Sequence, residues 1–247
     1  MPFCGHSQTF EPNFFLSRQG SISYQCLMPK GFKEDQKYPM VLFLHGAGER
    51  GSDNQKQLVH GSDLFLQKST QDKYPAMVIF PQCPKDIYWA NVERIENASG
   101  DRQFNFGVSE NPTSSMKMLL SLVDSLVQLS FVDQKRIYVM GLSMGGMGTF
   151  EIVSRRPDLF AAAIPICGGG DVKQVNKYAS TTDFWIFHGA KDQVVLPKYS
   201  EEMVRALQHA GATSRFTLYE DANHNSWDPA FDESELLNWL FAQQKSN

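Results

Sequence analysis

The stretch Val139–Thr149, with the sequence VMGLSMGGMGT, decides the fold because it places a single serine among glycines at the end of an apolar run. Its residues 141–145 match the pattern G-x-S-x-G, which marks a tight turn between a buried strand and a helix, the nucleophile elbow. Such a turn strains the serine backbone, and glycine two residues to either side removes the Cβ atoms that would collide. We therefore expect Ser143 to project above the edge of a sheet as a nucleophile.

The residues around this motif alternate between short strand-like runs and longer helical ones, which is typical of strands joined by helices in a mostly parallel sheet. We expect an antiparallel hairpin at residues 9–17 and 21–28 and six further strands within 38–46, 74–82, 136–141, 160–169, 183–189 and 214–220. Helices are expected at 113–129, 147–156, 198–209 and 233–243. The expected fold class is α/β, with about eight strands, helices on both faces of the sheet and a single domain over residues 1–247.

Residues 85–111 fit neither period, because they are polar and interrupted by glycines. Loops of this length are uncommon inside compact domains and tend to be lids or binding loops. We therefore expect a long loop here that lines a substrate pocket or covers it. Its aromatic residues either line that pocket or pin the loop to the core; they are Tyr88, Trp89, Phe104 and Phe106.

A serine hydroxyl becomes a good nucleophile only when an imidazole takes its proton and an acid orients that imidazole. After an elbow serine the chain order is acid and then histidine, each after the end of a strand. His224 follows the last expected strand in a polar loop, and Asp192 follows the strand 183–189. The acids that compete with Asp192 are Asp171, Glu220 and Asp221. The other histidines precede the acid, lie in a strand or end a helix; they are His6, His45, His60, His188 and His209.

Hydrolysis through such a serine also needs N–H groups that stabilise the developing oxyanion. The backbone N–H of Met144 is expected to be one of them, because the residue after the nucleophile opens a helix. The second donor is expected in the glycine-rich loop after the strand 38–46, at Ala47 or, alternatively, at Gly46. We expect His45 and the pair Glu49 and Arg50 to hold the shape of this loop.

Composition excludes several other classes of protein. The formal charge of −4 over 247 residues includes no basic stripe for a nucleic acid, and no apolar run is long enough to span a membrane. Four cysteines without CxxC spacing predict free thiols and no metal site, although Cys4 and His6 lie close together near the start. The first residues lack a secretory pattern, so we expect a cytoplasmic protein, or a secreted or periplasmic one if a leader precedes this sequence.

The chain resembles α/β-hydrolases, and more narrowly the carboxylesterases grouped with polyhydroxybutyrate-depolymerase-like proteins and feruloyl esterases. The matching segments lie between about Tyr38 and Trp227; they are LHGAGERG, PQCP, GLSMGGMGTFE, RRPDLFAAAIPICGGGD, FHGAKDQVV and DANHNSW. Some relatives carry a further N-terminal domain or a secretion signal, so localisation and oligomeric state do not carry over from them.

The resemblance implies a serine carboxylesterase that hydrolyses small carboxylic esters through an acyl-enzyme and needs no cofactor. Feruloyl or acetyl esters of plant polysaccharide are candidate substrates, with Trp89 and Trp227 as candidate contacts. Two alternatives remain open at this point. One is a serine peptidase related to the prolyl oligopeptidase catalytic domain, and the other is a binding module that kept the fold without the chemistry.

Overall fold

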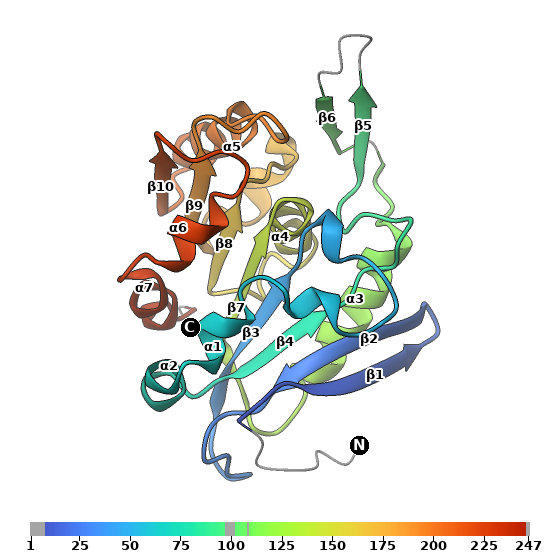
Figure 1. Cartoon of the computed structure of the whole chain (residues 1–247), viewed down its shortest axis with the longest axis vertical. Coiled ribbons are helices and arrows are strands. Elements are labelled where there is room, and N and C mark those ends of the chain that lie inside the picture. The colour runs from blue at the N-terminus through green and yellow to red at the C-terminus, as the bar shows by residue number, and fades with distance from the viewer. Residues whose placement is uncertain (1–7, 97–101, 108, 246–247) are drawn as a thin grey trace.

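The computed structural model describes residues 8–96, 102–107 and 109–245. Within these ranges, eight strands form the main sheet in the order β1-β2-β4-β3-β7-β8-β9-β10 (Figure 1). They are β1 (Glu11–Ser17), β2 (Gly20–Leu27), β3 (Tyr38–Leu44), β4 (Met77–Pro81), β7 (Val132–Leu142), β8 (Ala162–Ile166), β9 (Asp183–Gly189) and β10 (Ser214–Tyr219).

The sheet is parallel except at one edge. β1 pairs with β2 and β2 pairs with β4 in antiparallel register, whereas β4, β3, β7, β8, β9 and β10 run parallel to one another. This confirms the expected sheet of about eight strands, mostly parallel, with an antiparallel N-terminal hairpin. All of the parallel strands end at the same edge, so the loops that follow them gather there.

Both faces of the sheet are covered, as expected. The central strand β3 illustrates the effect of this double burial on sequence. Every residue of β3 is buried. Met40, Leu42 and Leu44 face one apolar cluster, whereas Val41 and Phe43 face a second one. Side chains alternate between the two sides of a strand, so a strand with helices on both sides needs apolar residues at every position.

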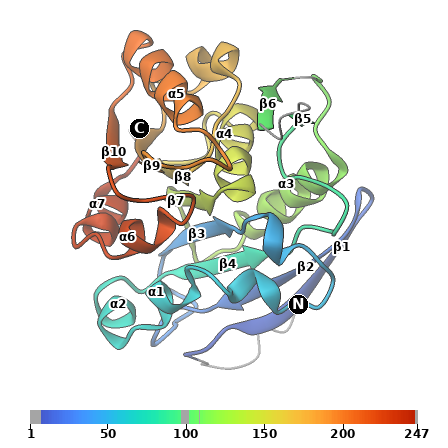
Figure 2. The same ribbon diagram turned by 45° about the horizontal axis from the view of Figure 1, so that its top comes forward.

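The helices divide between these two clusters (Figure 2). On the first face lie α3 (Ser114–Leu126), α4 (Met144–Arg155) and α5 (Lys198–His209). On the second lie α1 (Ser62–Leu66), α6 (Trp227–Phe231) and α7 (Leu236–Ala242), with α2 (Lys68–Lys73) following α1. Three 3-10 helices, η1 (Ala47–Glu49), η2 (Lys56–Leu58) and η3 (Val172–Lys177), lie in the connections. No helix in the described part of the chain is both long and apolar enough to cross a membrane.

The helices agree with the expected ranges to different degrees. α5 has the expected bounds, and α3 lies inside its expected range. α4 begins at Met144, three residues earlier than expected, because the helix opens directly after the elbow serine. α7 is shorter than expected, and the short helices α1, α2 and α6 carry too few turns to produce a clear helical period.

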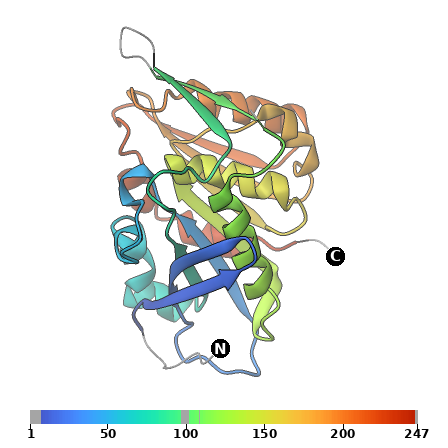
Figure 3. The same cartoon turned by 90° about the vertical axis from the view of Figure 1, so that its right-hand side faces the viewer.

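The segment 85–111 corrects the expectation of one long irregular loop. It contains a two-stranded antiparallel hairpin, β5 (Val92–Glu96) and β6 (Arg102–Phe106), which projects from the body of the molecule (Figures 1 and 3). Four of the five residues of β5 are exposed, with alternate side chains facing solvent on both sides. A strand without a buried face has no apolar alternation, so the pattern that reveals most strands is missing here.

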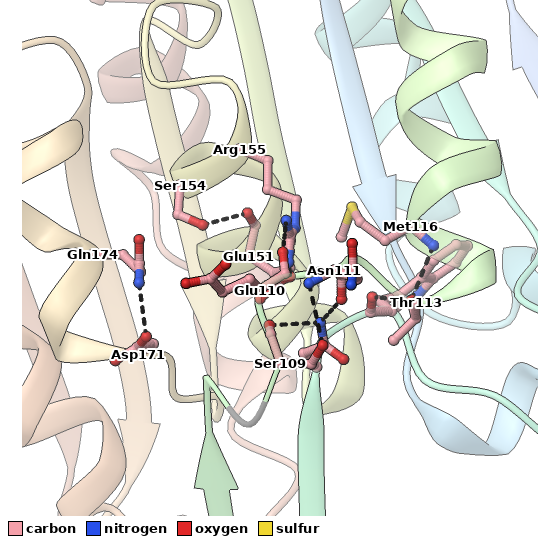
Figure 4. A network of polar contacts seen from close by, with 12 residues as sticks. Ser109, Glu110, Asn111, Thr113, Met116, Glu151, Ser154, Arg155, Asp171 and Gln174 are labelled. Atoms are coloured by element: carbon pink, nitrogen blue, oxygen red, sulfur yellow. Dashed lines mark hydrogen bonds and ion pairs between the residues drawn. The ribbon is translucent and has the colours of Figure 1, made fainter.

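The hairpin is fixed to the body of the molecule where β6 leads back towards α3 (Figure 4). Arg155 of α4 donates a hydrogen bond to the carbonyl oxygen of Glu110 (3.0 Å) and forms an ion pair with Glu151 (2.5 Å). The side-chain amide of Asn91 donates to the carbonyl oxygens of Ser109 (3.1 Å) and Asn111. The Arg155 contact attaches the base of the hairpin to the helix that begins at the elbow, and the Asn91 contacts join the segment before β5 to the segment after β6.

Candidate active site

Ser143 lies in the turn between β7 and α4, in a backbone conformation that serine rarely adopts. Its φ is 53° and its ψ is −117°. The Ser143 amide donates a hydrogen bond to the carbonyl oxygen of Ile166 at the end of β8 (2.9 Å), and its carbonyl oxygen accepts from Met147 (3.0 Å). Left-handed backbone of this kind is strained, and it persists because the packed elements on both sides hold it.

The glycines of the elbow do not have a positive φ, so their backbone conformation does not require glycine. Close packing requires it instead. A Cβ atom at Gly145 would lie 1.8 Å from the carbonyl oxygen of Leu44, at the end of β3. A Cβ atom at Gly141 would lie 2.4 Å from the carbonyl oxygen of Gly145. The first turn of α4 therefore lies directly against the ends of β7 and β3.

The structure brings Ser143, His224 and Asp192 together in one hydrogen-bonded chain. The Nε2 atom of His224 lies 2.9 Å from the Oγ atom of Ser143, and its Nδ1 atom lies 2.7 Å from an Oδ2 atom of Asp192. The three residues follow the ends of β7, β10 and β9, respectively. An ionised carboxylate only accepts, so Nδ1 carries the proton and Nε2 is left to accept the proton of the serine.

Asp192 is held in its ionised form by hydrogen bonds. Its Oδ1 atom accepts from the amides of Val194 (2.8 Å) and Val195 (3.0 Å), and its side chain is fully buried. Burial alone would raise the pKa of Asp192, but the hydrogen bonds from His188 and His224 outweigh it and hold this pKa well below the usual range. The carboxylate is therefore charged across the pH range in which a histidine titrates.

The three competing acids lie in other environments. Asp171 caps η3, where it accepts hydrogen bonds from the amide of Lys173 and the side chain of Gln174. Asp221 pairs with Lys191 at the surface, and Glu220 is exposed. Among the described residues, Asp192 is the acid that contacts the Nδ1 atom of His224.

The loop after β3 meets the elbow where the two expected N–H donors lie. Ala47 begins η1, Met144 begins α4, and both line the same pocket as Ser143. The first amides of a helix lack partners within that helix, so both residues have N–H groups available to an oxyanion. Gly46, the alternative donor, also lines this pocket.

Arg50 and His45 fix the shape of this loop. The Nε atom of Arg50 donates to the carbonyl oxygen of Ala47 (2.9 Å). The Nε2 atom of His45 accepts from the amide of Cys83 (2.9 Å), and its Nδ1 atom lies 2.6 Å from the carbonyl oxygen of Gly46. His45 therefore holds the loop as a neutral imidazole protonated at Nδ1. Burial lowers the pKa of His45 to about 4, because the charged form would be poorly solvated.

A pocket of about 320 Å³ opens over Ser143. Its walls combine apolar and aromatic side chains with Glu49, His60 and Arg94. The apolar and aromatic residues are Tyr88, Phe104, Leu142, Met144, Met147, Val194, Val195 and Trp227. Phe104 lies in the middle of β6, opposite Arg94, and its amide donates to the hydroxyl of Tyr199 (2.9 Å). The segment 85–111 thus supplies part of the pocket wall.

The structure separates the two tryptophans expected to contact substrate. Trp227 lines the pocket, with its ring centroid 5.4 Å from that of His224. Trp89 does not: it is fully buried, donates to the carbonyl oxygen of His45 (3.2 Å) and packs closely against Gly148 of α4. The expected substrate contact at Trp89 is therefore corrected to a packing role, which follows from the lack of a side chain at Gly148.

One group of side chains has the composition of a metal site. Ligand atoms of Cys167, Asp192 and His224 all lie within 4.8 Å of one another. Asp192 and His224 already hydrogen-bond each other, and burial raises the pKa of the Cys167 thiol far above its usual value. The ring nitrogens of His224 already contact Asp192 and Ser143, so the geometry favours acid–base chemistry over metal binding. Cys4 and His6 lie outside the described residues.

The fold and the arrangement of these side chains are those of an α/β-hydrolase. Residues 32–235 match the phospholipase/carboxylesterase family, and the chain belongs to this family.

Two comparisons reach beyond the fold alone. A solved thermostable esterase is 36% identical, with a TM-score of 0.85 over 96% of this chain and 63% of that one. A poly(3-hydroxybutyrate) depolymerase of Ralstonia pickettii is 31% identical over 51% of this chain and 24% of its own length. The chain thus spans less than two thirds of either relative.

A third comparison shows the fold. A ferulic acid esterase of Anaeromyces mucronatus, solved with ferulic acid, has a TM-score of 0.65 over 95% of this chain and 90% of that one, at 15% identity.

His188 and Arg94 contribute to this region although the sequence did not single them out. The position of His188 within a strand argues against it as the base, yet the strand β9 ends beside Asp192 and brings the two side chains together. Arg94 lies on the hairpin that lacked an apolar period. A signal for His188 was available, since a histidine at the end of a parallel strand lies at the edge where the loops gather.

Substitution of Gly145 tests the packing of the elbow. We expect Gly145→Ala to lower the free energy of unfolding by more than about 3 kcal/mol, or to prevent folding, because the added Cβ atom meets backbone at the end of β3. Gly48→Ala is the matched control, since nothing lies within 4 Å of a Cβ atom there. Equal stability of the two variants in denaturant unfolding contradicts this account.

Burial of neutral His45 predicts a loss of stability in mild acid. The unfolded state takes up a proton near pH 6.5 and the folded state only near pH 4, so the stabilisation is complete above pH 6.5 and disappears as the pH falls towards 4. The stabilisation lost between these two pH values is about 3 kcal/mol, from the lowering of the His45 pKa. Between pH 7.5 and 4, we expect the free energy of unfolding of His45→Gln to fall by about that much less than the wild type. Identical pH dependence of the two proteins would refute this.

Proposed function

We propose that this protein is a serine carboxylesterase that hydrolyses small carboxylic esters through an acyl-enzyme. The observation that carries the proposal is the hydrogen-bonded chain from Ser143 through His224 to Asp192, which opens on a pocket. Membership of the phospholipase/carboxylesterase family and the likeness to a thermostable esterase support the same chemistry.

In the first half of the reaction, the Oγ atom of Ser143 attacks the ester carbonyl carbon while the Nε2 atom of His224 takes its proton. The resulting imidazolium is stabilised by the carboxylate of Asp192. His224 then delivers the proton to the leaving alcohol, and the acyl group remains on Ser143. In the second half, His224 takes a proton from water, the hydroxide attacks the acyl-enzyme, and Ser143 recovers its proton as the acid leaves.

The negative charge that develops on the carbonyl oxygen needs donors that are already in place. We propose the backbone N–H groups of Met144 and Ala47 for this role. His45 and Arg50 support it by holding the loop that carries Ala47. A loop fixed before the reaction loses no free energy to reorganisation when the charge appears, which is the main advantage of such donors.

The pocket favours substrates with a compact acyl group. Its volume of about 320 Å³ is at the lower end of small-molecule sites, and its aromatic lining at Tyr88, Phe104 and Trp227 suits acetyl or hydroxycinnamoyl groups. We therefore propose acetyl and feruloyl esters of plant polysaccharide as substrates to test first. A ferulic acid esterase with the same fold supports the choice of feruloyl esters.

Removal of the nucleophile tests the mechanism. We expect Ser143→Ala to lower kcat on p-nitrophenyl acetate by about three orders of magnitude or more, because attack from bulk water lacks the activated hydroxyl. The assay panel includes longer p-nitrophenyl esters, methyl ferulate, acetylated xylan and an aminoacyl p-nitroanilide. Full turnover by Ser143→Ala contradicts the mechanism. Cleavage of the anilide by the wild type, without ester hydrolysis, would identify a peptidase instead of an esterase.

The pH dependence of hydrolysis tests the protonation of His224. His224 must be neutral to take the proton of Ser143, so we expect kcat/KM to fall at acid pH with a slope of one. Asp192 does not contribute to this fall, because its hydrogen bonds keep its pKa well below the usual range. The profile is measured with p-nitrophenyl acetate over a range in which unfolding is excluded by circular dichroism. A profile that stays flat down to pH 4 is incompatible with His224 as the base.

A further inference from the structure

A second histidine, which is buried, contacts the same carboxylate oxygen of Asp192 as His224 does. His188 lies near the end of β9 and is fully buried. Its Nε2 atom lies 3.2 Å from the Oδ2 atom of Asp192 and 2.8 Å from the carbonyl oxygen of Val195. Both of these oxygens only accept hydrogen bonds, so the Nε2 atom of His188 carries a proton and donates it to the two of them.

The other ring nitrogen of His188 decides whether the imidazole is neutral or charged. Its Nδ1 atom lies 2.7 Å from the hydroxyl oxygen of Ser200 in α5, and that oxygen also lies 3.1 Å from the carbonyl oxygen of Gly168. Ser200 has a single proton to donate. If it donates to Nδ1, His188 is neutral; if it donates to Gly168, Nδ1 must itself carry a proton and His188 is a cation.

The full burial of His188 favours the neutral form, because a cation there would lose its hydration. The Asp192 carboxylate is the anion in contact with it and by itself favours a cation, but this carboxylate already accepts hydrogen bonds from His224 and from the amides of Val194 and Val195. The Cys167 thiol lies within 4.8 Å of the same carboxylate, and burial raises its pKa, so it adds no charge there. A cation at His188 would compete with the His224 imidazolium for one buried carboxylate at the moment when the reaction needs that charge. A neutral donor orients the carboxylate without taking its charge.

We propose that His188 is a positioning residue that acts as a neutral, Nε2-protonated imidazole, holding the carboxylate of Asp192 towards His224 and tying it to the turn at Val195. This proposal rests on the proposed esterase function. It also connects the triad with the pocket, because Val195 lines the pocket and its amide and carbonyl groups both belong to this network. The carboxylate is then fixed on both oxygens before substrate binds.

Two substitutions at His188 and one control separate positioning from simple packing. His188→Leu removes the donor, whereas His188→Gln keeps an N–H group at about the same distance from the backbone. His209→Leu is the control, since His209 is the exposed last residue of α5. We expect His188→Leu to lower kcat about tenfold or more, with little change in KM for p-nitrophenyl acetate, and we expect the glutamine variant to recover most of kcat.

The pH profile supplies a readout that packing alone does not move. Without the hydrogen bond from His188, the Asp192 carboxylate favours the protonated form of His224 more strongly. We therefore expect the acid limb of kcat/KM to move to higher pH in His188→Leu and to return towards the wild-type position in His188→Gln. A folded leucine variant with wild-type kcat and an unmoved acid limb overturns the proposal.

A measurement on the unmodified protein keeps the proposal testable if the leucine variant does not fold. In a 15N NMR spectrum of histidine-labelled wild type, assigned with His188→Gln, we expect a neutral His188 protonated at Nε2 throughout the acid limb. A His188 that is cationic there, or protonated only at Nδ1, refutes it. Wild type and Ser143→Ala are run in the same assay, so an inert wild type rejects the esterase function, whereas an active wild type with unaffected His188 variants rejects the role of His188 alone.

Discussion

The contact between the first turn of α4 and the end of β3 is the constraint on which the rest of the site depends. Gly145 has no side chain, so the helix lies against the carbonyl oxygen of Leu44. This contact holds Ser143 in its strained conformation and sets its distance from the loop that follows β3. A larger residue would separate the nucleophile from Ala47, which comes three residues after Leu44. One missing Cβ atom thus sets the relative position of the attacking atom and one proposed oxyanion donor.

The parallel sheet supplies the remaining parts of the site. Because its strands end at a common edge, residues that are 81 positions apart, such as Ser143 and His224, meet within hydrogen-bonding distance. The interior of the sheet does not take part in the chemistry. It provides a rigid base, with apolar side chains on both sides of each central strand, so that the loops start from fixed points.

The central strands, the elbow and the order of Ser143, Asp192 and His224 were predictable because each leaves a local trace. Buried strands are apolar runs, and the G-x-S-x-G turn has a fixed composition. The strand β5 left no such trace, since four of its five residues are exposed, and in β6 the alternation covers too few residues to stand out. An aromatic residue in a loop, such as Trp89, is compatible with lining the pocket and with packing against the core, so the sequence does not separate these two roles. The burial of Trp89 depends on Gly148, a residue 59 positions away that only the folded chain places beside it. His188 was missed for a related reason, because its partner is defined by the turn after the strand.

The way in which the hairpin is attached has a consequence for how this scaffold varies. Arg155 and Asn91 hold the segment after β6 through the carbonyl oxygens of Glu110, Ser109 and Asn111. Every residue type has a backbone carbonyl oxygen. These contacts therefore place little demand on the side chains of residues 109–111. Phe104, in the middle of β6, forms part of the pocket wall. Most of β5 is exposed and is therefore free to vary in sequence, whereas a substitution at Phe104 would reshape the pocket wall and leave the residues that break the ester bond in place.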